Sequence, residues 1–163
     1  MGENPTVAKA FLHMWEEPCI SGTRGSGTVF FSGCNLKCIF CQNHEISHGG
    51  TGKEITAGEL ATIFLSLKSK GAHNINLVTP SHYIPAIKEA LEIARIDIPV
   101  IYNTNAYDSL EGLKMLEGLV DIYLPDLKYI SPEVSAEYSG ASNYFDVASK
   151  AVLEMYRQTG KPV

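Results

Sequence analysis

Three cysteines close together near the N-terminus are the residues best suited to metal chemistry. Cys34, Cys38 and Cys41 have the spacing C-x3-C-x2-C, and Gly33 before them allows a tight backbone turn. Thiolates so close in sequence can converge on one metal centre. Three protein ligands leave one iron of a cubane [4Fe–4S] cluster free to bind another molecule. The spacing therefore indicates an iron–sulfur cluster with one open coordination position.

A structural zinc ion and disulfide bonds are the alternatives for these cysteines. Zinc would need Cys19 as its fourth ligand, although structural zinc sites usually pair two short Cys-x2–4-Cys segments. The first ten residues lack the charged and then apolar layout of a signal peptide, which predicts a cytoplasmic protein with reduced thiols. A cluster is therefore favoured, and Cys19 is expected to be a small buried residue.

The cysteine segment also resembles a known signature. Residues 31–43, with aromatic Phe40 before the last cysteine, are similar to the motif of the radical S-adenosylmethionine (radical SAM) superfamily. More closely, the chain resembles the activating enzymes of pyruvate formate-lyase. Supporting similarities lie in residues 13–22, 78–80, 102–105 and 126–128.

This resemblance implies a defined chemistry. Cys34, Cys38 and Cys41 would hold a [4Fe–4S] cluster, and its open iron would bind S-adenosylmethionine. Reduction of the sulfonium would then release a 5′-deoxyadenosyl radical. In the activating enzymes this radical takes a hydrogen atom from a glycine of a partner glycyl radical enzyme. A flavodoxin or ferredoxin is the implied electron donor.

The same resemblance suggests which residues contact the cofactor. Phe40 is expected near the adenine. Members of the family usually have a glycine-rich motif ending in an acid that receives the methionyl amino group, but this chain has Val78-Thr79-Pro80 there. The Thr79 hydroxyl or a backbone carbonyl would replace that motif. The other expected contacts with the cofactor or a small cation are Asn103, Thr104, Asn105, Asp126 and Lys128.

Apolar runs at 28–32, 74–79, 99–102 and 120–124 are typical of buried strands and alternate with segments of helical spacing. The helices include one behind a Thr56–Glu59 capping box, one capped by Asp108, and one over 145–158 with Phe145 and Tyr156 on its buried stripe. The pattern predicts an α/β fold, a partial (β/α) barrel of parallel strands with about four βα units. Such folds carry their chemistry at the carboxyl ends of the strands.

The expected domain organisation is an N-terminal extension over 1–27 and a radical SAM partial barrel over 28–163 that is incomplete at the C-terminus. A closed eight-unit barrel needs roughly 250 residues, whereas this chain has 163. A truncated or split-barrel module that binds an iron–sulfur cluster without turnover is therefore an alternative function. A zinc-binding structural module is a further one.

Composition argues against other functions. The 13 basic and 18 acidic residues give a net charge of −5, and no basic run is present to bind a nucleic acid. No apolar run approaches the roughly 18 residues that span a bilayer, so no membrane partner is expected. Glu16 and Glu17 are predicted to form a solvated loop. His44 and His82 are near the expected site, but surface or hydrogen-bonded roles are favoured for them.

Overall fold

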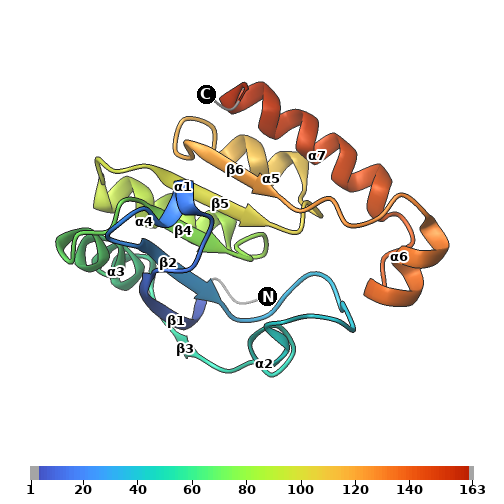
Figure 1. Cartoon of the computed structure of the whole chain (residues 1–163), viewed down its shortest axis with the longest axis horizontal. Coiled ribbons are helices and arrows are strands. Elements are labelled where there is room, and N and C mark those ends of the chain that lie inside the picture. The colour runs from blue at the N-terminus through green and yellow to red at the C-terminus, as the bar shows by residue number, and fades with distance from the viewer. Residues whose placement is uncertain (1–3, 162–163) are drawn as a thin grey trace.

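The computed structural model describes residues 4–161 and contains one six-stranded sheet. The strand order is β3-β1-β2-β4-β5-β6 (Figure 1). The strands are β1 (Thr6–His13), β2 (Ser26–Phe31), β3 (Lys53–Glu54), β4 (Ile75–Val78), β5 (Val100–Thr104) and β6 (Ile122–Pro125). The helices are α1 (Pro18–Ser21), α2 (His44–Ser47), α3 (Ala57–Ser69), α4 (Ile84–Ala94), α5 (Leu110–Met115), α6 (Pro132–Ser139) and α7 (Tyr144–Thr159).

Four neighbouring strands form the parallel part of the sheet. β2, β4, β5 and β6 pair in the order in which they occur in the chain, and a helix crosses over between each pair. These are the four strands that the apolar runs predicted, with ends that differ by no more than two residues. The sheet order and the helices between the strands agree with a partial β/α fold of the radical SAM type.

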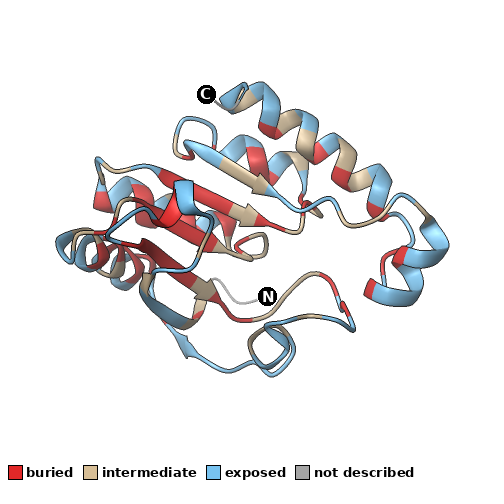
Figure 2. Ribbon diagram, in the orientation of Figure 1, coloured by how far each residue is buried: buried red, intermediate tan, exposed pale blue. Residues whose placement is uncertain are grey.

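One face of the sheet is covered by helices. Residues of α3, α4, α5 and α7 share a single hydrophobic core with β1, β2, β4 and β5, and Figure 1 shows α3 and α4 behind the strands. The burial colours of Figure 2 place the most continuous buried stretches in the central strands. Strands that are buried on both faces have unbroken apolar runs, which is why the sequence revealed β2, β4 and β5. The run at 120–124 was also expected to be a buried strand, but β6 is exposed or half-buried along its length because it lies at the edge of the sheet.

The sequence predicted a sheet of parallel strands, but the sheet is mixed. β1 and the short β3 run antiparallel at one edge. β1 belongs to the segment that the sequence assigned to an N-terminal extension, and it pairs with β2 along most of its length. Its exposed and half-buried positions follow no strict alternation, so no strand pattern was visible there.

The short helix α1 lies on the sheet face opposite the large helices (Figure 1). A buried asparagine holds it there, because Asn74 Nδ2 donates to the Ile20 carbonyl over 2.7 Å. The Ser26 hydroxyl donates to Asn74 Oδ1 over 2.6 Å, so both ends of this amide are engaged. The connection between β1 and β2 is therefore fixed against the sheet.

The helices confirm some sequence predictions and correct others. The capping box of α3 is present, with Thr56 and Glu59 each bonded to the other's backbone. In α7, however, the buried residues are Tyr144, Ala148, Ala151 and Met155. Phe145 and Tyr156, predicted on the buried stripe, are 36% and 52% exposed. Adjacent apolar stripes on one helix are hard to separate without knowing the packing partner.

Within residues 4–161, none of the helices combines the length and the apolar character that crossing a bilayer requires.

Candidate functional site

Side chains from the loops after β2, β4, β5 and β6 line one pocket of about 680 Å³. It lies at the carboxyl ends of the parallel strands, where this class of fold usually binds ligands. Every residue that the sequence assigned to the cluster or the cofactor lines this pocket: Cys34, Cys38, Phe40, Cys41, Thr79, Asn103, Thr104, Asn105, Asp126 and Lys128. The fold thus brings these side chains together, and their roles as ligands stay predictions.

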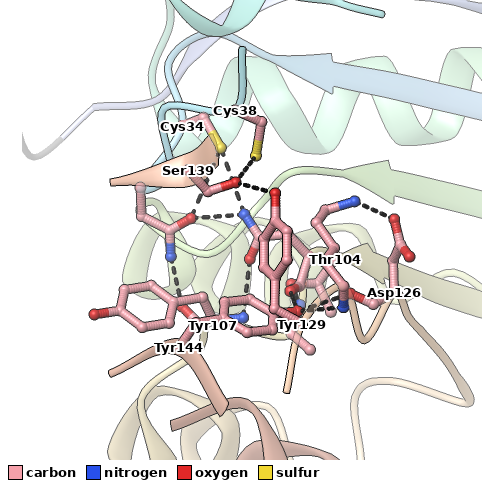
Figure 3. Close-up of polar contacts among 12 residues, drawn as sticks. Cys34, Cys38, Thr104, Tyr107, Asp126, Tyr129, Ser139 and Tyr144 are labelled. Carbon is pink, nitrogen blue, oxygen red and sulfur yellow. Dashed lines mark hydrogen bonds and ion pairs between the residues drawn. The ribbon is translucent and has the colours of Figure 1, made fainter. Parts of the chain in front are cut away.

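Each of the three cysteine sulfurs has a hydrogen-bonding neighbour, and Figure 3 shows those of Cys34 and Cys38. The contacts are Asn105 Nδ2–H and Leu36 N–H to Cys34 at 3.5 and 3.4 Å, Ser139 Oγ–H to Cys38 at 2.9 Å, and Ser47 Oγ with Cys41 at 3.2 Å. Hydrogen bonds to sulfur stabilise thiolates and tune the potential of iron–sulfur clusters.

The three thiols fit a cluster but are not preassembled. No three His, Cys, Asp or Glu side chains of residues 4–161 are already arranged to hold a metal ion. Burial raises the pKa of the Cys34 thiol, and the nearby Cys38 and Cys41 raise it further. These thiols lose their protons when metal binds. Three neighbouring sulfurs in one pocket suit an iron–sulfur centre.

Helix α6 closes over the cysteine loop. Lys37 N–H donates to the Ser139 carbonyl and Ile39 N–H donates to the Tyr138 carbonyl, each over 3.0 Å. A small second core then forms from Leu36, Cys38, Ala106, Ala141, Tyr144 and Ala148. Helix α6 was not among the helices predicted from the sequence, although Ser131 caps it and Pro132 opens its first turn, which are the usual signals of a helix start.

The end of β5 is held by a buried network. Thr104 Oγ1–H and Tyr102 O–H donate to the two carboxylate oxygens of Asp108 over 2.6 and 2.8 Å. The sequence predicted that Asp108 caps a helix, but its carboxylate is used in this network and Ser109 caps α5 instead. Because the Thr104 hydroxyl is bonded to Asp108, Thr104 holds the end of β5 in position beside the pocket.

Asn105 connects that strand end to the cysteine loop. Its Nδ2 donates to Asn35 Oδ1 over 2.9 Å as well as to Cys34, and its Oδ1 accepts from Tyr107 N–H over 2.9 Å. Asn35 Nδ2 in turn donates to the Tyr107 carbonyl. The two amides lock the loop after β5 onto the loop after β2.

Charged and aromatic groups form another wall. Lys128 Nζ pairs with the Asp126 carboxylate and lies 6.0 Å from the centre of the Phe40 ring. Phe40 is 53% exposed and meets the Tyr129 ring edge-on. An aromatic ring open on one side provides a surface on which a flat group such as a nucleobase can stack.

Tyr144 joins the ends of β5 and β6. Its hydroxyl lies 2.7 and 2.9 Å from the carbonyls of Asn105 and Asp126, and it accepts from Lys128 N–H over 3.0 Å. Burial raises the pKa of Tyr144 to about 12, so the phenol stays protonated. Figure 3 shows Tyr144 beneath the polar network.

Thr79, the residue after β4, has an unusual backbone conformation. Its φ is +56°, a left-handed value that β-branched residues rarely adopt, and its N–H donates to the Asn103 carbonyl over 3.0 Å. Strained backbone of this kind often marks a functional site. Thr79 and Asn103 both line the pocket at the carboxyl ends of β4 and β5.

Several residues outside the sequence predictions also matter. Glu16 was predicted in a solvated loop, but it is half-buried, lines the pocket and accepts from Asn76 Nδ2 over 3.1 Å. Its neighbour Glu17 is exposed as predicted. Cys19 was predicted to be buried but is exposed, because it occupies the outer side of α1. It does not line the pocket of the other cysteines.

The two histidines near the site have structural surroundings. His82 Nε2 is hydrogen-bonded to the Ser32 carbonyl over 2.8 Å, and His44 stacks on His48 at 4.3 Å between ring centres. Neither of them lines the pocket. The hydrogen-bonded and surface roles that the sequence favoured agree with these positions.

A mostly parallel α/β fold with a three-cysteine loop after its first parallel strand defines a class of cofactor-dependent proteins. The family model of the radical SAM superfamily matches residues 28–163, and the chain belongs to this superfamily. It is also 36% identical over 149 residues to an uncharacterized protein of Methanocaldococcus jannaschii. That alignment covers 86% of this chain and 43% of the relative, so the chain spans less than half the length of the relative. Membership implies a [4Fe–4S] cluster and S-adenosylmethionine.

Proposed function

We propose that this protein reductively cleaves S-adenosylmethionine, in the manner of the activating enzymes of glycyl radical enzymes. The observation that carries the proposal is the pocket itself. Three cysteines from one loop share it with polar and aromatic side chains from the ends of β4, β5 and β6. The family match supports the reaction class, and the activating-enzyme assignment rests on the sequence resemblance.

The residues of the pocket have separate tasks in this proposal. Cys34, Cys38 and Cys41 would hold the cluster, and Asn105 and Ser139 would stabilise its thiolates by hydrogen bonds. When bound, the cluster supplies the electron that breaks a carbon–sulfur bond of the sulfonium.

The other residues would bind and orient S-adenosylmethionine. Phe40 offers its open ring to the adenine, while Thr79 and Asn103 present polar groups at the ends of β4 and β5. Asp126 and Lys128 provide a paired carboxylate and ammonium beside the ring of Phe40. Thr104 keeps the β5 end in place through Asp108.

The proposed partners follow from the activating-enzyme resemblance. A flavodoxin or ferredoxin would donate the electron, and a glycine of a glycyl radical enzyme would be the substrate. A cytoplasmic location is part of the same proposal, since thiols stay reduced there and remain available to the cluster. A carbon-centred radical also requires that water and oxygen be excluded during the reaction.

A cluster-binding module without turnover is the second candidate. It is favoured by the position of β6 at the edge of the sheet. Apolar side chains in the segment that follows β6 are also exposed, including Leu127 and Ile130 at 48% and 76%. A larger assembly could cover them and complete the pocket.

Anaerobic reconstitution with iron and sulfide tests both candidates. We expect about four irons per chain, an electron paramagnetic resonance (EPR) signal of the reduced cluster that changes on addition of S-adenosylmethionine, and 5′-deoxyadenosine after reduction with dithionite. A cluster without 5′-deoxyadenosine favours the second candidate. One zinc per chain and no iron would contradict both and support a structural zinc module.

A further inference from the structure

Two carboxylates line the pocket, and their charges are balanced differently. Asp126 is neutralised by Lys128, with which it forms an ion pair. Glu16 takes part in none of the ion pairs found within residues 4–161. Its carboxylate is therefore the negative charge of this pocket that still lacks a positive partner among the described residues.

Glu16 is held in place by the sheet and by its own loop. Asn76, which is fully buried in β4, donates through Nδ2 to Glu16 Oε2 over 3.1 Å. The Glu16 N–H donates to the Ser21 hydroxyl over 2.9 Å, and that hydroxyl donates to the His13 carbonyl. These bonds fix both the backbone and the carboxylate of Glu16, which reduces the cost of ordering it when a ligand binds.

Among the described residues, the one Lys or Arg side chain that lines this pocket is Lys128, and it is paired with Asp126. His13 lines the same pocket, and its Nδ1 accepts a hydrogen bond from Trp15 N–H over 3.1 Å. The buried Asn76 Oδ1 has no hydrogen-bond partner among the described residues. The Glu16 carboxylate, which lines the pocket, thus offers acceptor oxygens, and a ligand group with several N–H donors would complement it.

We infer that Glu16 is the acceptor for the methionyl amino group of S-adenosylmethionine. This inference rests on the proposed function and assigns one of its binding residues. Glu16 lies outside residues 28–163, which match the family model, and comes from the connection between β1 and α1. The segment after β4, Val78-Thr79-Pro80, carries no acidic side chain that could serve this amino group. A residue from a different part of the chain supplies the carboxylate instead.

Glu16→Gln tests the assignment, and Glu17→Gln is its matched control. Both changes remove one negative charge, but Glu17 is exposed and lies outside the pocket. The amide introduced by Glu16→Gln keeps an oxygen for the bond from Asn76, so the loop should stay folded. Cluster content, measured as iron and sulfide per chain, and the thermal unfolding temperature should match the wild type in both variants.

Three ligands then separate the possible contacts on the reconstituted protein. S-adenosylmethionine has an amino group and a sulfonium, S-adenosylhomocysteine has the amino group alone, and methylthioadenosine has neither. Calorimetric titration should show that Glu16→Gln weakens the binding of S-adenosylmethionine and S-adenosylhomocysteine roughly 10- to 100-fold, since a hydrogen bond to a charged group is lost. Methylthioadenosine should bind all forms equally. Glu16→Ala should weaken the first two ligands at least as strongly.

Specific results would overturn the inference. Equal S-adenosylmethionine affinity of Glu16→Gln and the wild type would exclude Glu16 and leave the proposed function intact. A loss confined to S-adenosylmethionine would show that Glu16 serves the sulfonium and not the amino group. A wild-type protein that holds its cluster and binds no S-adenosylmethionine would overturn the proposed function together with this inference.

Discussion

The Ser139 hydroxyl donates a hydrogen bond to the Cys38 sulfur over 2.9 Å, although 101 positions separate the two residues. Both are buried, and the Tyr129 hydroxyl lies 2.6 Å from the same serine oxygen (Figure 3). Helix α6 thus contributes directly to the surroundings of the cysteine loop. A buried hydrogen bond to sulfur matters most when the sulfur carries negative charge.

Ser139→Ala should lower the reduction potential of the reconstituted cluster. Reduction adds negative charge, which the hydroxyl stabilises, so its loss disfavours the reduced state. We expect a shift of about 20–60 mV, because a tenfold change in a one-electron equilibrium corresponds to about 59 mV. Anaerobic redox titration followed by EPR measures it. Ser135→Ala is the control, since Ser135 is buried in the same helix and its hydroxyl donates to the Pro132 carbonyl. Equal potentials in the two variants would argue against the role of Ser139.

Alanine substitution of Cys34, Cys38 or Cys41 should each abolish the cubane cluster, because two thiolates cannot replace three. Cys19→Ala should keep it, since Cys19 is exposed and lies away from the pocket. Iron analysis and the visible charge-transfer absorption after reconstitution measure the difference. Loss of iron from Cys19→Ala would contradict the proposed ligand set.

Tyr144→Phe should destabilise the fold by about 1–3 kcal/mol, the cost of leaving buried polar groups without their partner. The hydroxyl contacts the carbonyls of Asn105 and Asp126 and the N–H of Lys128, and Tyr144 is fully buried. Urea unfolding followed by circular dichroism gives the change in free energy. Tyr107→Phe removes a more exposed hydroxyl, bonded to Asn143, and should cost less than about 0.5 kcal/mol. Similar losses in both variants would refute the special role of Tyr144.

Acid should destabilise the protein partly through His82. Burial lowers the pKa of His82 below its ordinary value of 6.5, while the bond to the Ser32 carbonyl opposes that shift. The unfolded chain therefore binds a proton at a higher pH than the folded chain does. The free energy of unfolding should fall as the pH drops below about 6.5 and level off below the folded pKa. Urea unfolding between pH ~7.5 and ~5 measures this loss. His82→Gln should reduce it and His44→Gln should not; an unchanged pH dependence in His82→Gln would contradict this.

The sequence by itself determined the parallel strands and the position of the cysteine loop. Strands such as β4 are buried on both faces, so their apolar runs identify them without any knowledge of their neighbours. The rule that chemistry gathers at the carboxyl ends of parallel strands then predicted that residues as distant as Thr79 and Lys128 would line one pocket. The capping box of α3 was equally visible, because its contacts are local.

Only the tertiary structure decided which polar groups meet. Asp108 was assigned to a helix cap by sequence, but it is buried against Thr104 and Tyr102. Glu16 was predicted to lie in a solvated loop. It lines the pocket instead, because a hydrogen bond from Asn74 holds α1 against the sheet. Hydrogen bonds between residues far apart in sequence leave no periodic signal. They form when packing brings donors and acceptors together and excludes water, which makes an unpaired polar group costly.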